Sequence, residues 1–238
     1  MKNSFLDSNI IFESKFAQEI LILSKDTVIK DKLEEKDNFI LKVFYCFSEI
    51  SEKFSDINYS YLHILNYPNN KEYRRIFPIQ KYNSYHTEIY TIKIIALFDR
   101  ILHLINLLYN LKLKWLRLKL DNIKRSNKVD KKVLIILEKF NDKIWDLRKW
   151  QNYIKHEWSL DIPELQKINL YQLLINHSKD LDEKTRKIME LFIKLEFKIY
   201  KGNHKKNLLE NTKWIASFIN EILEWLYPTF INSVNEFK

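Results

Sequence analysis

Residues 133–158 read VLIILEKFNDKIWDLRKWQNYIKHEW, and their apolar side chains recur at steps of three and four. At about 100° per residue, this spacing gathers them on one stripe of an α-helix, which would pack into a bundle. We therefore predict one long amphipathic helix over residues 129–158. Its packing stripe, in which only Gln151 is polar, consists of Val133, Leu137, Phe140, Ile144, Leu147, Gln151, Ile154 and Trp158.

A second stripe lies on nearly the opposite side of this predicted helix. Lys149 is two turns before His156 with an offset of about 20°, and Asn152 lies between them. Arg148 is further round, at about 80° from His156, and Gln151 at about 140°. The members of this second face are Asp142, Trp145, Lys149, Asn152 and His156.

The composition indicates helices throughout the chain. One glycine and four prolines leave few residues for the tight turns that β-hairpins need, whereas Leu, Ile, Lys and Glu are abundant. We predict an all-α bundle of about six to eight helices, forming a single domain over residues 1–238. Residues 58–85, which hold two prolines and many tyrosines, are predicted to form an irregular segment that covers the core, with a short helix near Tyr59–Leu65.

The same spacing places the remaining helices. Asp161 and Glu164 have the separation of a capping box around Pro163, so a helix is expected to start there and end near Asn176. Gly202 is expected to break the chain between the last two helices, and Pro228 to lie just past the end. The other predicted helices cover residues 9–25, 28–57, 86–111, 182–200 and 204–227.

Scarce residues exclude several classes of function. A single glycine excludes the P-loop and the dinucleotide-binding fingerprint, and the single cysteine, Cys46, excludes an internal disulfide and fits a reducing cytoplasm. Lys93 and the pair Asp99-Arg100 interrupt the most apolar region, so we expect no membrane helix, and the N-terminus does not have the pattern of a signal peptide. We expect neither a metal nor another cofactor, because no metal-ligand spacing is found around His63, His86, His103, His177 or His204.

Residues 112–132 carry much of the formal charge of +9, with nine basic residues against two acidic ones. Trp115 lies inside this basic segment, an arrangement typical of surfaces that bind single-stranded RNA. The alternative is a solvated connection between helices, with Trp115, Leu116, Leu118 and Leu120 packed inward.

Residues 150–157, Trp-Gln-Asn-Tyr-Ile-Lys-His-Glu, resemble the Arg-Asn-x-x-Lys-His-Glu form of the HEPN signature, in which an arginine precedes a histidine by four to six residues near a helix end. The upstream stretch from Tyr85 to Arg100 is similar to the helix that precedes the motif in the Cthe-type branch of that superfamily. Together the two stretches cover about a third of the chain. His156 and Asn152 match the motif, but Gln151 stands in the position of the arginine.

This resemblance implies a helical bundle that forms a homodimer and engages RNA, either as a metal-independent endoribonuclease of a defence or toxin system or as a catalytically inactive module that binds RNA, a nucleotide or a protein partner such as an antitoxin. In the active form, the histidine moves a proton at the ribose 2′-hydroxyl or the leaving oxygen, and a cation stabilises the phosphorane charge. His156 and Asn152 would take these roles, with Lys149 or Arg148 in place of the missing arginine, and Lys155 near the substrate.

Other interpretations of the same residues stay open. Lys93, Arg100 and His103, at seven- and three-residue steps, would form either a polar seam toward the motif, binding substrate, or a set of contacts between helices with Asp99 as counter-charge. His156 would alternatively neutralise the dipole at a helix C-terminus. Trp145, Trp150 and Trp158 are expected to anchor the core or a dimer interface.

Overall fold

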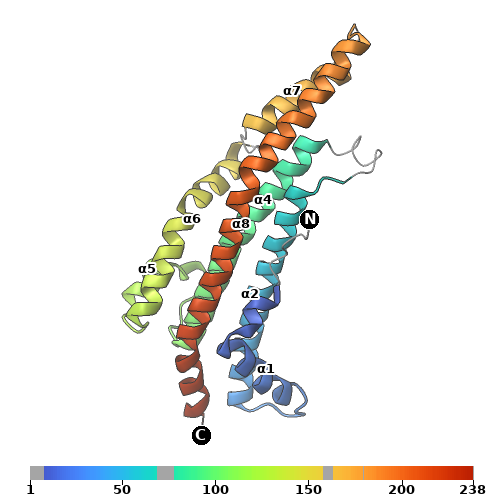
Figure 1. Cartoon of the computed structure of the whole chain (residues 1–238). Coiled ribbons are helices and arrows are strands. Elements are labelled where there is room, and N and C mark those ends of the chain that lie inside the picture. The colour runs from blue at the N-terminus through green and yellow to red at the C-terminus, as the bar shows by residue number, and fades with distance from the viewer. Residues whose placement is uncertain (1–7, 69–77, 158–162, 179, 238) are drawn as a thin grey trace. The chain divides into compact units, whose positions relative to one another are not determined.

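The computed structural model describes residues 8–68, 78–157, 163–178 and 180–237, without the side chains of residues 8–10, 80, 146, 149–157, 163–164 and 204–205. Over these ranges the chain forms seven α-helices and two short 3-10 helices, with no strand, so the predicted all-α helical bundle is confirmed (Figure 1). In chain order the elements are η1 (Ser8–Glu13), α1 (Lys15–Val28), α2 (Glu35–Leu65), α4 (Ile79–Leu108), η2 (Trp115–Arg117), α5 (Leu120–Arg125), α6 (Lys131–Glu157), α7 (Pro163–His177) and α8 (Glu183–Glu236).

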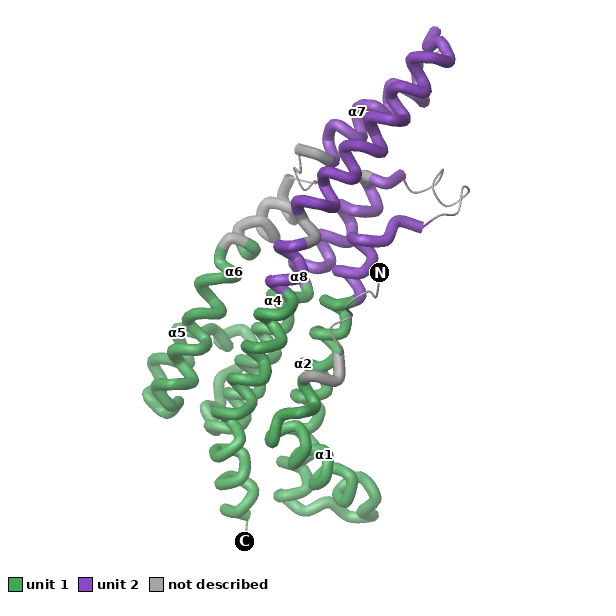
Figure 2. Tube along the Cα trace, viewed as in Figure 1, with its two compact units in different colours: residues 1–58, 93–148, 212–238 green, residues 59–92, 149–211 purple. Residues whose placement is uncertain are grey.

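The helices form two compact units (Figure 2). Unit 1 contains residues 1–58, 93–148 and 212–238, and unit 2 contains residues 59–92 and 149–211. Four helices, α2, α4, α6 and α8, contribute residues to both units. The single domain over residues 1–238 stays a prediction.

The core of unit 1 is built around Phe140 of α6. Its ring stacks on Phe98 of α4, with centroids 5.2 Å apart, and lies 4.1 Å from the ring of Phe218 and 4.9 Å from that of Trp214, both on α8. A second aromatic contact joins α1 to α8, where the ring of Phe16 is 5.2 Å from that of another α8 residue, Phe230. Burial of these rings holds α1, α4, α6 and α8 together in this unit.

Unit 2 has fewer buried side chains, and several of them carry hydroxyl groups. Tyr82 and Tyr200 are almost fully buried. The Tyr90 hydroxyl donates to the carbonyl of Leu208 at 3.4 Å, and Thr87 Oγ1 lies 3.4 Å from the Tyr200 hydroxyl. These contacts tie the start of α4 to α8 with hydrogen bonds as well as apolar area.

Two short-range signals set the starts of α1 and α2 later than the periodicity predicts. The Ser14 hydroxyl accepts the Ala17 N–H at 3.2 Å, which caps α1 after the 3-10 turn of η1. The Asp37 carboxylate accepts the Glu34 N–H at 3.0 Å and the Lys30 ammonium at 2.7 Å. The predicted helix 28–57 was therefore too early at its start, because residues 29–34 form the turn that this carboxylate closes.

The predicted irregular segment 58–85 is shorter in the structure. The helix expected near Tyr59–Leu65 is observed as the end of α2, which continues without a break to Leu65, and α4 begins at Ile79, earlier than the predicted start at residue 86. Apolar residues on the inner face continue the helical spacing there, since Ile57, Tyr61 and Ile64 are all buried. Residues 69–77 lie outside the described residues.

The predicted break at Gly202 and the predicted end before Pro228 were also wrong, because α8 is one helix of 54 residues that contains both. A glycine inside a helix costs about 1 kcal/mol and a proline about 3 kcal/mol. The fully buried Leu226 and Phe230 flank Pro228, and burial of each side chain contributes about 1.5–3 kcal/mol. Packing thus offsets the local preference for ending the helix. The predicted helix from Pro163 is observed as α7, while its expected cap, Asp161, lies outside the described residues.

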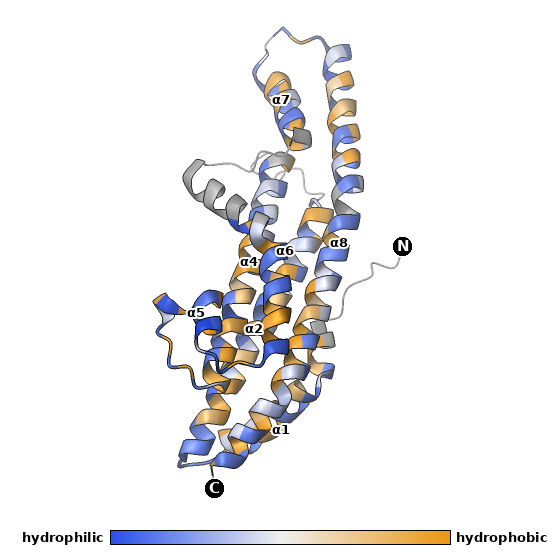
Figure 3. Cartoon of the chain, turned by 90° about the vertical axis from the view of Figure 1, so that its left-hand side faces the viewer, coloured by the Kyte–Doolittle hydropathy of each residue, from blue (hydrophilic) through white to orange (hydrophobic). Residues whose placement is uncertain are grey.

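Hydrophilic and hydrophobic residues alternate along the helices, including α7 and the part of α8 beside it (Figure 3). Within the described ranges, no helix has a stretch long and apolar enough to cross a membrane. The alternation is the pattern of helices that keep one face in water.

Candidate functional site

Helix α6 carries the two faces that the sequence predicts, as far as its side chains are described. Val133, Leu137, Phe140 and Ile144 are buried, which confirms the first half of the packing stripe. On the other face Asp142 and Trp145 are exposed. Residues 149–157 continue the same α-helix, but the side chains of Lys149, Gln151, Asn152, Lys155 and His156, with those of Trp150 and Trp158, lie outside the described residues. Their predicted roles stay predictions.

Arg148, the last residue of α6 in unit 1, is held against α4. Its guanidinium carbon is 5.3 Å from the ring centroid of Phe98, and its Nη2 atom is 3.8 Å from Asp99 Oδ1. Its Nε atom is buried and has no hydrogen-bond acceptor among the described residues. Because the ion pair is long and the side chain is partly exposed, the terminal nitrogens of this guanidinium retain donors for another anion or acceptor.

The three residues of the predicted polar seam on α4 contact α2. Lys93 pairs with Asp56, and Arg100 Nη1 is 3.1 Å from Glu49 Oε2. His103 Nδ1 is 3.3 Å from the sulfur of Cys46, whose pKa burial raises to about 11. These contacts agree with the interpretation as links between helices, although α2 supplies the counter-charges and Asp99 lies beside Arg148 instead.

The turn after α4 is fixed by Asn106. Its side-chain amide donates to the carbonyl of Leu113 at 3.1 Å, and its Oδ1 accepts the Leu113 N–H at 3.0 Å. Between them, Asn110 and Lys112 have φ of 46° and 56°, the left-handed region that is strained for residues with a side chain. This double hydrogen bond helps to hold the strained turn and leads the chain into η2, which begins with Trp115.

The start of the basic segment does not pack inward. Trp115 is 57% exposed and Leu116 88% exposed, so the inward-packing alternative is wrong for these two residues. It is right for Leu120, which is buried. A single 3-10 turn offers too little apolar surface to bury both Trp115 and Leu116. Arg100 lies over the Trp115 ring at 5.4 Å from its centroid, and His103 meets it edge to face.

These elements enclose a cavity of about 470 Å³ in unit 1, called the tryptophan cavity below. Its lining comes from α4, from η2, α5 and the two residues between them, and from α6. Trp145, which is 54% exposed, contributes a second indole. The polar side chains of the lining are Asp99, Lys119, Asp121, Asn141 and Arg148, and the others are Leu102, Trp115, Leu116, Leu118, Leu120 and Trp145.

Sequence reasoning singled out Trp115, Trp145 and Arg148 on separate grounds and did not bring them together. Asp99 and Asn141 were missed as site residues. Asp99 directly precedes Arg100 on α4, and Asn141 directly precedes Asp142 on α6. Helical spacing alone therefore gives no reason to choose Asp99 or Asn141 as a site residue over the polar residue beside it.

Burial raises the pKa of the Asp99 carboxyl in the tryptophan cavity, and the charges of Arg148 and Arg100 partly oppose that effect. Among the described residues, no group of three or more His, Cys, Asp or Glu side chains is placed to hold a metal ion.

Comparison with known proteins gives no match. No protein-family model fits the chain, and neither a curated protein nor a solved structure is significantly similar to it.

Proposed function

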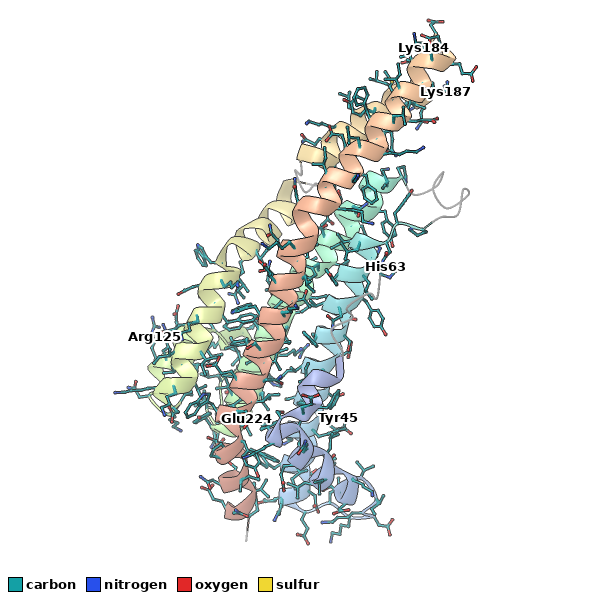
Figure 4. All side chains as sticks on the ribbon, viewed as in Figure 1. Tyr45, His63, Arg125, Lys184, Lys187 and Glu224 are labelled. Atoms are coloured by element: carbon teal, nitrogen blue, oxygen red, sulfur yellow. The ribbon has the colours of Figure 1, made fainter. Side chains whose placement is uncertain are left out.

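We propose that the protein binds single-stranded RNA through the basic segment and the tryptophan cavity. The observation that carries this proposal is the exposure of Trp115 within the basic segment, residues 112–132, which holds nine basic residues. An inward-packed Trp115 side chain would instead have indicated a solvated connection between helices. Exposed indoles beside lysines and arginines are the means by which single-stranded nucleic acids are bound without strict sequence preference. Arg125 of α5, which is labelled in Figure 4, is an exposed residue of the basic segment in unit 1.

The second part of the proposal is metal-independent cleavage of the bound RNA. It rests on the HEPN resemblance of residues 150–157 and on the continuation of α6 through them. In this account His156 moves the proton of the 2′-hydroxyl, Asn152 orients it, and Lys149 supplies the charge that Gln151 lacks. A catalytically inactive module that binds RNA is the alternative.

RNA incubated with the protein in EDTA separates these two. Cleavage that persists in the chelator and is lost in His156→Ala supports the enzyme. The matched control is His177→Ala, an exposed histidine in the last turn of α7. Salt-sensitive RNA binding without cleavage supports the inactive module, and equal cleavage by wild type and His156→Ala would remove the nuclease assignment.

We also propose a homodimer. In unit 2, the rings of Tyr171 and Phe192 stack with centroids 5.6 Å apart, and Lys167 pairs with Glu196 at 3.7 Å. Around these contacts, large apolar residues stay in water, as expected of an interface. The exposed apolar residues are Leu170, Leu173 and Leu174 of α7 and Ile188, Leu191, Phe192, Leu195 and Ile199 of α8. Sedimentation at several protein concentrations tests the dimer.

A further inference from the structure

The tryptophan cavity has the size and lining of a site for one small planar group. Its volume of about 470 Å³ lies within the usual range of about 300–1,000 Å³ for small-molecule sites. Among the lining residues, Leu102 and Leu120 are buried, whereas Trp115 and Trp145 expose more than half of their surface. Buried apolar groups together with two exposed indoles suit a flat aromatic ligand, such as a nucleobase.

The cavity holds one of its indoles in place before any ligand arrives. Arg100 lies over the Trp115 ring at 5.4 Å and is itself paired with Glu49 at 3.1 Å. His103 meets the same ring at 6.3 Å, edge to face. Because these contacts restrict the ring, stacking a base on Trp115 loses little side-chain entropy. Arg100 and His103 are therefore positioning residues.

The polar lining is suited to the edge of a base. Asp99 offers two carboxylate oxygens, and its side chain is 46% exposed although Arg148 is nearby. Arg148 makes only a long ion pair, at 3.8 Å, so its terminal nitrogens can donate to a ligand, and Asn141 can donate or accept. An acceptor pair next to donors matches guanine, which presents the N1–H and the N2 amino group beside the O6 acceptor.

From this lining we infer that the tryptophan cavity receives one unpaired guanine of a single-stranded RNA, with Asp99 accepting from N1–H and N2–H and Arg148 or Asn141 donating to O6. The inference rests on the proposed function, because the basic segment is taken to hold the flanking phosphates. Adenine and uracil each present one donor group at this edge and not two adjacent ones, so they leave one Asp99 oxygen without a donor and bind here less tightly than guanine.

The test compares four adenosine-rich 2′-O-methyl RNAs of about 12 nucleotides, which carry guanine, inosine, adenine or uracil at the centre. The guanine and inosine oligonucleotides differ only by one amino group. The methyl group removes the 2′-hydroxyl nucleophile. Their affinities for the full chain are measured by fluorescence anisotropy at low and high salt. We expect guanine to bind about ten-fold more tightly than inosine, which lacks the N2 amino group, since a hydrogen bond to a charged acceptor is lost.

Variants assign that preference to the cavity. Asp99→Asn should bring the ratio of guanine to inosine affinity to within about two-fold, since the charged acceptor is gone. Trp145→Leu should weaken binding of all four oligonucleotides, and Phe237→Leu, which removes an exposed aromatic ring of the same unit outside the cavity lining, should leave both affinity and preference unchanged. Circular dichroism confirms the folding of each variant.

The possible failures are distinct. Equal affinity of the wild type for guanine and inosine, with salt-sensitive binding retained, overturns the guanine site and leaves RNA binding in place. A preference that survives Asp99→Asn in a folded protein also overturns it. Absence of binding to every oligonucleotide at low salt overturns the proposed function and the guanine site together.

Discussion

Arg148 Nη2 lies 3.8 Å from Asp99 Oδ1, and the same guanidinium lies over the ring of Phe98. The pair joins α6 to α4 at the wall of the tryptophan cavity. At this distance the ion pair is weak, and the buried Arg148 Nε has no acceptor among the described residues. Arg148 is thus held in place more by the aromatic ring than by the carboxylate.

Replacing Arg148 should therefore weaken RNA binding more than it weakens the fold. We expect Arg148→Gln to lower the affinity for single-stranded RNA by about ten-fold, and Arg148→Lys to recover only part of it, because lysine lacks the planar fork. Lys143→Gln is the control, since Lys143 also lies over a ring on the same helix, that of Trp214 at 4.3 Å, but outside the cavity. Equal losses in Arg148→Gln and Lys143→Gln would contradict a specific role for Arg148.

The basic segment should set the salt dependence of binding. Lys112, Lys114 and Arg117 are exposed, and their replacement by alanine should reduce the slope of log affinity against log salt by about two, at about 0.7 per phosphate contact. The measurement is RNA affinity between low and moderate salt.

A second triple variant of equal charge controls for the loss of net charge. Lys184, Arg186 and Lys187 are exposed at the start of α8, and Lys184 and Lys187 are labelled in Figure 4. Their replacement by alanine should leave the slope nearly unchanged. If both triples reduce the slope alike, net charge rather than the basic segment drives binding.

Stability should fall in mild acid because of His86. Its ring stacks on that of His63, with centroids 4.4 Å apart, and His63 Nδ1 lies 2.6 Å from the Tyr82 hydroxyl. Burial, followed by the neighbouring His63, lowers the pKa of His86 from 6.5 to about 4. The pKa of His86 is lower in the folded than in the unfolded state. The contribution of neutral His86 to the unfolding free energy is therefore complete above pH 6.5 and is lost as the pH falls toward 4.

Urea unfolding at neutral and mildly acidic pH measures this loss. For a partly exposed ring we expect a decrease in unfolding free energy on the order of 1 kcal/mol in the wild type. His86→Gln should remove that part of the decrease, and the exposed His177→Gln should not. A wild-type pH dependence that His86→Gln leaves unchanged would refute the assignment.

Gly202 should be replaceable with a gain in stability. It lies inside α8, and a Cβ added there meets nothing within 4 Å. Gly202→Ala is expected to raise the unfolding free energy by about 0.5–1 kcal/mol, and Gly202→Pro to lower it by about 3 kcal/mol. Thermal unfolding of both variants checks the pair. A destabilised Gly202→Ala would mean that the chain is not helical at this residue.

Periodicity predicted the fold class and the packing stripe of α6, because both depend on apolar residues that recur many times along a helix. Val133 and Phe140 are two of these residues, and both are buried. The helix ends predicted at Gly202 and Pro228 were wrong, since each rested on one residue and tertiary packing outweighs a cost of a few kcal/mol. The tryptophan cavity could not be predicted, because it joins Asp99, Trp115 and Trp145 from three separate segments. Packing of α6 on α4 brings Trp145 to Asp99, and the turn fixed by Asn106 leads the chain to Trp115.

The central claim is that RNA is bound at the tryptophan cavity, and the most direct measurement is the affinity of the double variant Trp115→Leu, Trp145→Leu for single-stranded RNA. Both indoles are more than half exposed, so the fold should persist. Because stacking on an aromatic residue contributes about 1–3 kcal/mol per base, we expect a loss of at least about five-fold, with the affinity of the control Phe237→Leu unchanged. A folded double variant that binds RNA as tightly as the wild type would contradict the claim.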